Sequence, residues 1–219
     1  FFAHSGYKLA DTTEELIESM LDEEWERPVG EGVGRISGDY EVATREYLDH
    51  LSTAITADLS GLRIAVDCAN GAASELGPEA LRRAVADVGV INASPDGKNI
   101  NDACGSTHPE QLQALVVASE ADFGVAFDGD ADRCLAVDHT GEMVDGDQIL
   151  GVLATGMKDD GKLVDDTLVI TGMSNLGLLL AMEERGIKTV STKVGDRYVL
   201  EAMKESGALL AAVHKELRS

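Results

Sequence analysis

Apolar and polar positions along the first part of the 219-residue chain follow a helical pattern. Apolar side chains at helical spacing predict a helix over residues 11–25, with Asp11–Thr13 as candidate caps and acidic side chains in the first turn. The glycine-rich segment 27–39 predicts a connector. A second helical pattern follows over 40–55, so the first part of the chain is expected to be helical.

From residue 61 onward, short apolar runs alternate with helical patterns. An apolar strand, a glycine-containing turn, a helix and a second strand are predicted over 61–97. In the following part of the chain, helices are predicted at 108–121 and 146–161, and strands at 123–127 and 134–138. A further unit covers 167–213, in which parallel strands are predicted at 167–171, 188–192 and 208–213 with a helix in each connection. This rhythm is that of βαβ units, and it predicts an α/β fold class.

The same patterns divide the chain into three parts. Residues 1–55 are expected to belong to a first domain, 56–160 to a second and 161–219 to a third. A hydrophobic content of 44% suffices for one large core or two modest ones. The chain is therefore expected to be globular.

Charge narrows the range of partners. Forty acidic against eighteen basic residues give a net charge of -22, which repels nucleic acids and anionic membrane surfaces. We therefore expect neither nucleic acid nor a membrane as a partner, and the absence of an apolar run of about 20 residues agrees. General solubility in a high-salt cytoplasm would also explain the acidic excess. The oligomeric state is left open.

The cysteines and the start of the chain bear on localisation. Cys68, Cys104 and Cys134 are odd in number and lack the close pairing of zinc or redox sites, which favours reduced thiols in a cytoplasmic protein. The chain begins without a basic leader or an initiator Met. We interpret it as a piece of a longer protein.

The segment "DGDADR" carries the strongest chemical signal. Asp128, Asp130 and Asp132 alternate in a short link between two predicted strands, and a tight turn at Gly129 would bring their carboxylates together. Three adjacent carboxylates repel one another unless a cation lies between them. Oxygen ligands suit Mg²⁺ better than Zn²⁺, which favours His and Cys. The spacing therefore predicts a Mg²⁺ site.

Three other structures could account for this segment. An Asp- and Gly-rich hairpin turn in solvent needs no ion. An EF-hand loop that starts at Asp128 needs Gly and Glu where the chain has Arg133 and His139, so this motif is excluded. A phosphatase of the haloacid dehalogenase type, with Asp128 as nucleophile, is disfavoured by Asp132 in place of Thr or Val.

Other motifs have simple structural explanations. The turn in "DCANGAASELG" is favoured as structural over an anion site. Thr107 and Glu110 form a candidate capping box around His108, and Asp145 and Asp147 suit a helix start better than a second metal site.

One further cluster is left open. Lys193, Asp196 and Arg197 surround the turn at Gly195, where either a surface ion pair or contacts to a substrate phosphate would explain them.

Six motifs in order closely resemble the bacterial phosphoglucosamine mutases of the α-D-phosphohexomutase superfamily, over roughly residues 1–210. They are "DCANGAA", "PDGKNINDACGSTHPEQL", "AFDGDADRCLAVD", "VDGDQIL", "MSNLGL" and "VGDRYVLEAM". The resemblance implies three-layer α/β/α domains with mixed sheets, incomplete here at both ends. It also implies an enzyme that interconverts glucosamine 6-phosphate and glucosamine 1-phosphate by phosphoserine- and Mg²⁺-assisted phosphoryl transfer.

The resemblance also implies roles for particular residues. Asp128, Asp130 and Asp132 would bind Mg²⁺, with a phosphoserine oxygen as a further ligand. Arg133 would lie beside the metal and orient the phosphoserine. The loop with Lys193 and Arg197 would face the cleft that binds a phosphorylated hexosamine.

Departures from the family pattern keep alternatives open. No segment matches the family's serine loop, and the chain reads "AVHKELRS" where the loop that selects the sugar is expected. By itself, the chain is expected to be inactive. A phosphomannomutase or phosphoglucomutase, and a non-catalytic Mg²⁺-binding module, are the alternative functions.

Overall fold

In the computed structural model, the chain divides into two units at Tyr40 and Glu41. The structure describes residues 3–35, 37–54, 58–84 and 86–211. The first unit contains α1 (Asp11–Leu21) and a 3₁₀ turn, η1 (Gly30–Gly32). The predicted helix is therefore present, but it ends four residues earlier than predicted. Ala10 occupies the N-cap position and makes no side-chain capping hydrogen bond, so the expected cap within Asp11–Thr13 is wrong.

The second unit begins with α2 (Tyr40–Ala54), which confirms the second predicted helix up to the last residue described there. Leu48 is buried on this helix, and Asp49 accepts a 2.8 Å hydrogen bond from Arg83. The ion pair is largely exposed, so it adds little to stability. Burial of Leu48 is the main apolar anchor of the helix.

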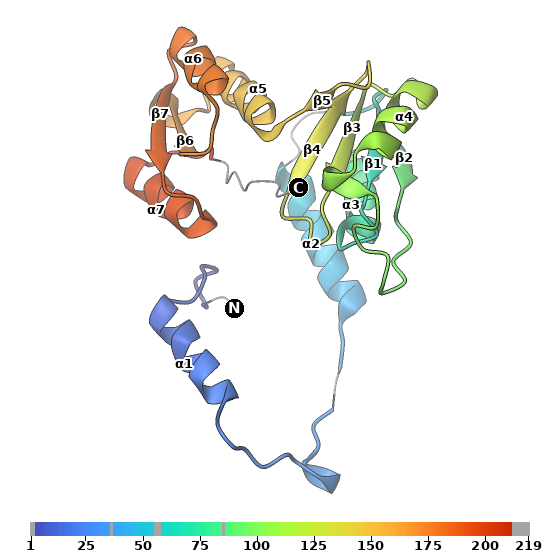
Figure 1. Ribbon diagram of the computed structural model, residues 1–219, viewed down its shortest axis with the longest axis vertical. Helices are drawn as coiled ribbons and strands as arrows, with labels where there is room; N and C mark the ends of the chain where they lie inside the picture. The colour runs from blue at the N-terminus through green and yellow to red at the C-terminus, as the bar shows by residue number, and fades with distance from the viewer. Residues whose placement is uncertain (1–2, 36, 55–57, 85, 212–219) are drawn as a thin grey trace. The chain divides into compact units, whose positions relative to one another are not determined.

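The larger sheet has five strands in the order β2-β1-β3-β4-β5 (Figure 1). The strands are β1 (Arg63–Asp67), β2 (Asp87–Ile91), β3 (Phe123–Phe127), β4 (Cys134–Asp138) and β5 (Met143–Val144). β1 pairs in parallel with β2 and β3, whereas β3, β4 and β5 form antiparallel pairs. The sheet is mixed, as predicted, and β3 and β4 have the predicted bounds.

Helices cover both faces of this sheet. The connecting helices are α3 (Ala73–Arg83), the 3₁₀ turn η2 (Gly105–Thr107) and α4 (Glu110–Ser119). Ile64 and Val66 lie in the core that includes the start of α3, whereas Ala65 lies in the core formed by Leu112 and Val116 of α4. Side chains alternate between the two faces of a strand, so β1 contributes to both cores.

A second, smaller sheet contains β6 (Thr167–Thr171) and β7 (Lys188–Thr192), which pair in parallel as predicted. The third predicted strand, within 208–213, is present in the described residues only as a bridge between Val169 and Ala211. The backbone N–H of Val169 donates a 3.1 Å hydrogen bond to the Leu210 carbonyl. Residues 212 and 213 lie outside the described part of the chain.

The smaller sheet also lies between helices. They are α5 (Gly146–Asp159), the 3₁₀ turn η3 (Val164–Asp166), α6 (Leu176–Glu184) and α7 (Asp196–Ser206). Leu150 of α5 and Met182 of α6 share a core with Ile170, whereas Val169 packs with Val199 of α7 on the other face. Both sheets therefore have the predicted three-layer α/β/α arrangement.

The cores suggest where the parts of the chain divide. The sequence analysis placed 146–159 in the second predicted domain, but its apolar side chains pack with β6 and α6. A boundary just before α5 therefore fits the packing better than one at 160. The division into three domains stays a prediction.

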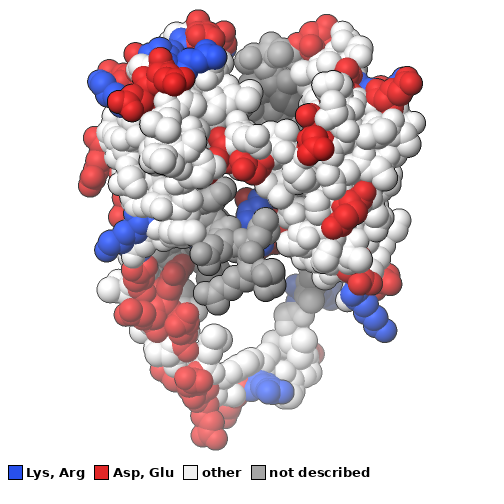
Figure 2. Space-filling model, turned by 45° about the horizontal axis from the view of Figure 1, so that its top comes forward, with Lys and Arg blue, Asp and Glu red and all other residues white. Residues whose placement is uncertain are grey.

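Acidic side chains are prominent on the surface, and Figure 2 shows them spread over the visible face with few basic ones. Among the residues that the structure describes, no helix combines the length and the apolar character needed to cross a bilayer.

Candidate metal centre

The loop 128–133 follows β3, at the point where the strand order of the larger sheet reverses. The chain passes from β1 to β2 on one side, then returns past β1 to form β3 on the other. In α/β sheets such a switch in strand order leaves a crevice outside the carboxyl ends of the strands, where ligands commonly bind. The loop after β3 and the turn after β1 both start from this edge.

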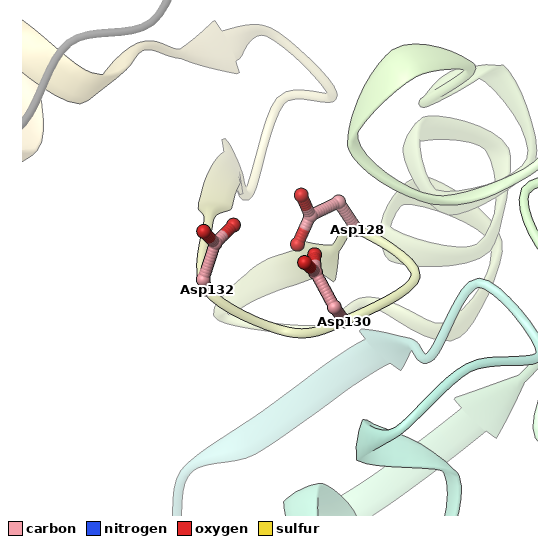
Figure 3. Close-up of side chains that lie close together, drawn as sticks. All are labelled: Asp128, Asp130 and Asp132. Atoms are coloured by element: carbon pink, nitrogen blue, oxygen red, sulfur yellow. The ribbon is translucent and has the colours of Figure 1, made fainter. Parts of the chain in front are cut away.

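The three aspartates of the loop point their carboxylates toward one another (Figure 3). One oxygen from each of Asp128, Asp130 and Asp132 lies within 4.8 Å of the others. Asp128 is 3% exposed, whereas Asp130 and Asp132 are open to solvent. Within the described ranges, no other group of three His, Cys, Asp or Glu residues comes together in this way. The structure thus brings together the three predicted ligands.

Arg133 is the cation next to this cluster. Its Nε donates a 2.6 Å hydrogen bond to Asp128 Oδ2 and lies 3.4 Å from Asp132 Oδ1, and its backbone N–H donates to Asp128 Oδ1 at 3.2 Å. The hydrogen bond to Asp128 raises the pKa of Arg133, the nearby carboxylates add to the effect, and partial burial opposes it. Arg133 therefore stays charged and holds the Asp128 carboxylate in place.

The turn within the loop differs from the prediction. Ala131, at φ 59°, adopts the left-handed conformation, and Gly129 does not. The Ala131 N–H donates to the Asp128 carbonyl at 3.1 Å, and the Asp128 N–H donates to the Arg133 carbonyl at 3.2 Å. Gly129 has another role, since a Cβ there would lie 2.6 Å from Asn101 Nδ2 and would displace that side chain.

The donor set fits a hard divalent cation. All three side chains offer oxygen, and each oxygen of Asp128 that accepts from Arg133 keeps a second lone pair for a metal. Three carboxylates balanced by one arginine leave the loop with excess negative charge. Exposed Asp130 and Asp132 leave room for water or a phosphate oxygen, as Mg²⁺ sites usually require.

The other predicted site residues lie on the smaller sheet. Lys193 follows β7, and its Nζ lies 5.6 Å from the centre of the Tyr198 ring. Asp196 and Arg197 open α7, where Arg197 Nε donates a 3.1 Å hydrogen bond to Glu201. All three predicted residues are exposed. Their role in substrate binding stays a prediction.

The two capping predictions had opposite outcomes. Asp145 caps α5 in a capping box with Gln148, as its acidic position predicted. Asp147 is buried and accepts a 2.8 Å hydrogen bond from the Asn175 N–H. The box predicted for Thr107 and Glu110 is wrong, because α4 begins after Pro109 and has no side-chain capping bond.

Sequence analysis missed two buried polar residues near the loop. Asp67, at the end of β1, is fully buried and accepts three hydrogen bonds. The Ser106 hydroxyl is buried and has no hydrogen-bond partner among the described residues. The sequence did contain a signal for Asp67, because this acid directly ends the apolar strand "RIAVD".

A carboxylate cluster at the switch point of one mixed sheet, followed in sequence by a second sheet between helices, defines an α/β protein with a candidate metal loop. The family model described as phosphoglucomutase/phosphomannomutase, alpha/beta/alpha domain II matches residues 45–141, and the model for domain III matches 145–212. The chain belongs to the phosphoglucomutase/phosphomannomutase family. This confirms the superfamily that the motifs indicated.

Curated relatives support a narrower assignment within the family. A phosphoglucosamine mutase of Bifidobacterium animalis subsp. lactis is 63% identical over 208 residues, which cover 93% of this chain and 46% of the relative. One of Streptomyces coelicolor is 55% identical over 215 residues, covering 96% of this chain and 47% of the relative. The chain thus spans a little under half the length of these relatives.

Solved structures share the fold. A phosphoglucomutase/phosphomannomutase family protein of Burkholderia thailandensis is 25% identical with a TM-score of 0.69, covering 78% of this chain and 37% of that one. An Aspergillus fumigatus N-acetylphosphoglucosamine mutase, in complex with GlcNAc-6P and magnesium, is 23% identical with a TM-score of 0.57. This match covers 74% of this chain and 37% of that one.

Proposed function

We propose that this chain contributes the second and third domains of a phosphoglucosamine mutase, which interconverts glucosamine 6-phosphate and glucosamine 1-phosphate. The observation that carries the proposal is the identity of 55–63% to phosphoglucosamine mutases over more than nine-tenths of the chain. The converging carboxylates of 128–132 support it, because phosphoryl transfer depends on neutralising and aligning phosphate oxygens. We place the parent protein in the cytoplasm.

The proposed cofactor is Mg²⁺, held by Asp128, Asp130 and Asp132. When bound, the ion supplies positive charge that neutralises a transferring phosphoryl group. Arg133 keeps Asp128 in place through its 2.6 Å hydrogen bond and adds a permanent positive charge beside the cluster. The acidic loop thereby serves a phosphorylated ligand despite its own sign.

The proposed substrate contacts lie on the loop between β7 and α7. Lys193 and Arg197 offer exposed cationic side chains, and Asp196 stands between them in sequence. Among the solved structures with this fold, the Aspergillus fumigatus enzyme holds GlcNAc-6P. We infer that a hexosamine phosphate binds with its phosphate near Lys193 and Arg197, and this is open to test by Lys193→Ala.

The metal site is tested first, by calorimetric titration of the 219-residue chain with Mg²⁺. Asp130→Ala is expected to weaken binding on the order of 100-fold while the circular dichroism spectrum stays unchanged, since Asp130 is exposed and supports no core. Asp159→Ala removes the same charge from the exposed end of α5 and serves as the matched control. Equal affinity in the Asp130 and Asp159 variants would rule out the site.

The activity is tested by following conversion of glucosamine 6-phosphate. The 219-residue chain with Mg²⁺ and a bisphosphate activator is expected to show no turnover, because no segment of it matches the family's serine loop. The same assay on a protein that joins these residues to the remaining domains is expected to show turnover, faster than with glucose 6-phosphate or mannose 6-phosphate. Preference for either hexose phosphate would favour the phosphoglucomutase or phosphomannomutase alternative suggested by the family name.

A further inference from the structure

The turn after β1 supports the metal loop through backbone contacts. The Ala72 N–H donates a 2.8 Å hydrogen bond to the carbonyl of Gly129, the residue between the first two aspartates of the loop. A Cβ on Gly71 would overlap the same carbonyl oxygen. The backbones of the turn and the loop are therefore in direct contact, and only glycine fits at position 71.

A second segment contacts the other side of the loop. A Cβ on Gly105 would lie 2.6 Å from the carbonyl oxygen of Phe127, which directly precedes Asp128. Gly129 itself lies against the side chains of Ile100 and Asn101. The residues on both sides of Asp128 are thus held between the turn after β1 and the segment 100–105.

Asp67 links the turn after β1 to the segment 100–105 through hydrogen bonds. One carboxylate oxygen accepts from the Ala69 N–H at 2.9 Å, and the other accepts from the Gly105 N–H at 2.9 Å and from Asn92 Nδ2 at 3.1 Å. The side chain is fully buried. A buried carboxylate with three donors is strongly held and fixes the position of each donor.

We propose that Asp67 is a positioning residue for the metal loop. By holding Ala69 and Gly105, it sets the two surfaces that enclose Phe127 and Gly129, and so determines how closely the carboxylates of 128–132 approach one another. The inference rests on the proposed Mg²⁺ site. It adds that the ligand geometry depends on a residue outside the loop.

Asp67→Asn tests this with a minimal change of shape. The amide can accept from some of the three donors, but its own NH₂ then faces an N–H group, so the arrangement has to shift. Gly71→Ala pushes the Gly129 carbonyl, and with it the loop, away from the turn after β1. It leaves the buried Asp67 carboxylate unchanged. Gly89→Ala is the matched control, because a Cβ at this position of the same sheet meets nothing within 4 Å.

Two measurements separate positioning from general stability. Calorimetric titration with Mg²⁺ is expected to show affinity weakened about tenfold or more in Asp67→Asn and Gly71→Ala, as is common for outer-shell partners of a metal. Luminescence lifetimes of bound Eu³⁺ in H₂O and D₂O count the waters on the ion, and more waters are expected in both variants. A role in stability alone would lower the melting temperature and leave the hydration of the ion unchanged.

The outcomes are distinct. Wild-type affinity and hydration in folded Gly71→Ala and Asp67→Asn would overturn the inference while the metal site stands. If Asp67→Asn does not fold, Gly71→Ala decides by the same two readouts. Failure of the unmodified chain to bind Mg²⁺ or Eu³⁺ would overturn the proposed metal site and this inference with it.

Discussion

A central strand of the larger sheet and an edge strand of the smaller sheet differ in how far they are enclosed. In the larger sheet, β1 has a neighbour on each side and four of its five residues are buried. In the smaller sheet, all five residues of β6 are buried, but none of β7 is, and Val190 is 37% exposed. A strand between two partners and two helical layers is protected, whereas a strand at an edge is not.

The difference extends to the loops. The loop 128–133 and the preceding Phe127 lie against two other segments beside the larger sheet, with close approaches at Gly71, Gly105 and Gly129. The loop that carries Lys193 and Arg197 follows an exposed strand and is itself exposed. Rigid loops suit the binding of a small ion, which needs fixed ligands. Exposed side chains suit contacts that form when a larger ligand arrives.

The largest expected effect comes from truncating a fully buried side chain in the core of the larger sheet. Leu112 is fully buried between α4 and the larger sheet, so Leu112→Ala is expected to cost about 2–5 kcal/mol of unfolding free energy. Leu209 is 62% exposed, and Leu209→Ala is expected to stay within about 0.5 kcal/mol. Urea denaturation of both variants measures this, and equal costs would remove the contrast.

Hydrogen exchange compares the sheets directly. Amides of 167–211 are expected to exchange faster than those of 63–138, because β7 is exposed and the third strand is reduced to one bridge at Ala211 in the described residues. The measurement is exchange mass spectrometry at neutral pH. Equal or stronger protection in 167–211 would show that the smaller sheet is covered in solution, for example by self-association.

Removing the helix cap at Asp145, between the two sheets in sequence, is expected to change the unfolding free energy less. Asp145 accepts a 2.8 Å hydrogen bond from the Gln148 N–H at the start of α5, and Asp145→Ala is expected to cost about 1 kcal/mol. Because α5 packs with β6 and α6, hydrogen exchange should rise in those elements and stay unchanged in β1 and β3. A rise in β1 and β3 alone would contradict this grouping.

The last expected effect is confined to alkaline pH and concerns the thiols, all of which lie in or near the larger sheet. Burial, aided by the charge of Asp67, raises the pKa of Cys68 to about 11 from an ordinary value of 9.0. The folded protein therefore holds this proton where the unfolded chain loses it, so stability falls as pH rises from 9 to about 11. Denaturation at several pH values should show a shallower fall in Cys68→Ala, and an identical fall would contradict the shift.

Much of the fold followed from local pattern. The strands 123–127, 134–138, 167–171 and 188–192 have the predicted bounds because short apolar runs ended by polar or turn residues carry their own boundaries. The cap at Asp145 was also predictable, since its partner Gln148 is three residues away. Predictions failed where the sequence offers several nearby positions at which a helix could begin. The capping box expected at Thr107 is an example, because α4 begins after Pro109.

The three aspartates and the segments that contact their loop show what the sequence determined and what the tertiary structure determined. Asp128, Asp130 and Asp132 are close in sequence, so the chain itself specified the cluster of oxygen donors from which a Mg²⁺ site is predicted. Only the tertiary structure decided that the left-handed residue of the loop is Ala131. It also decided that Gly71 lies against Gly129, and Gly105 against Phe127, from segments far away in sequence. The role of Asp67 depends on hydrogen bonds to residues 25 and 38 positions away. Such contacts form when strand order brings β1 between β2 and β3, and pairing across that distance is not encoded in any local pattern.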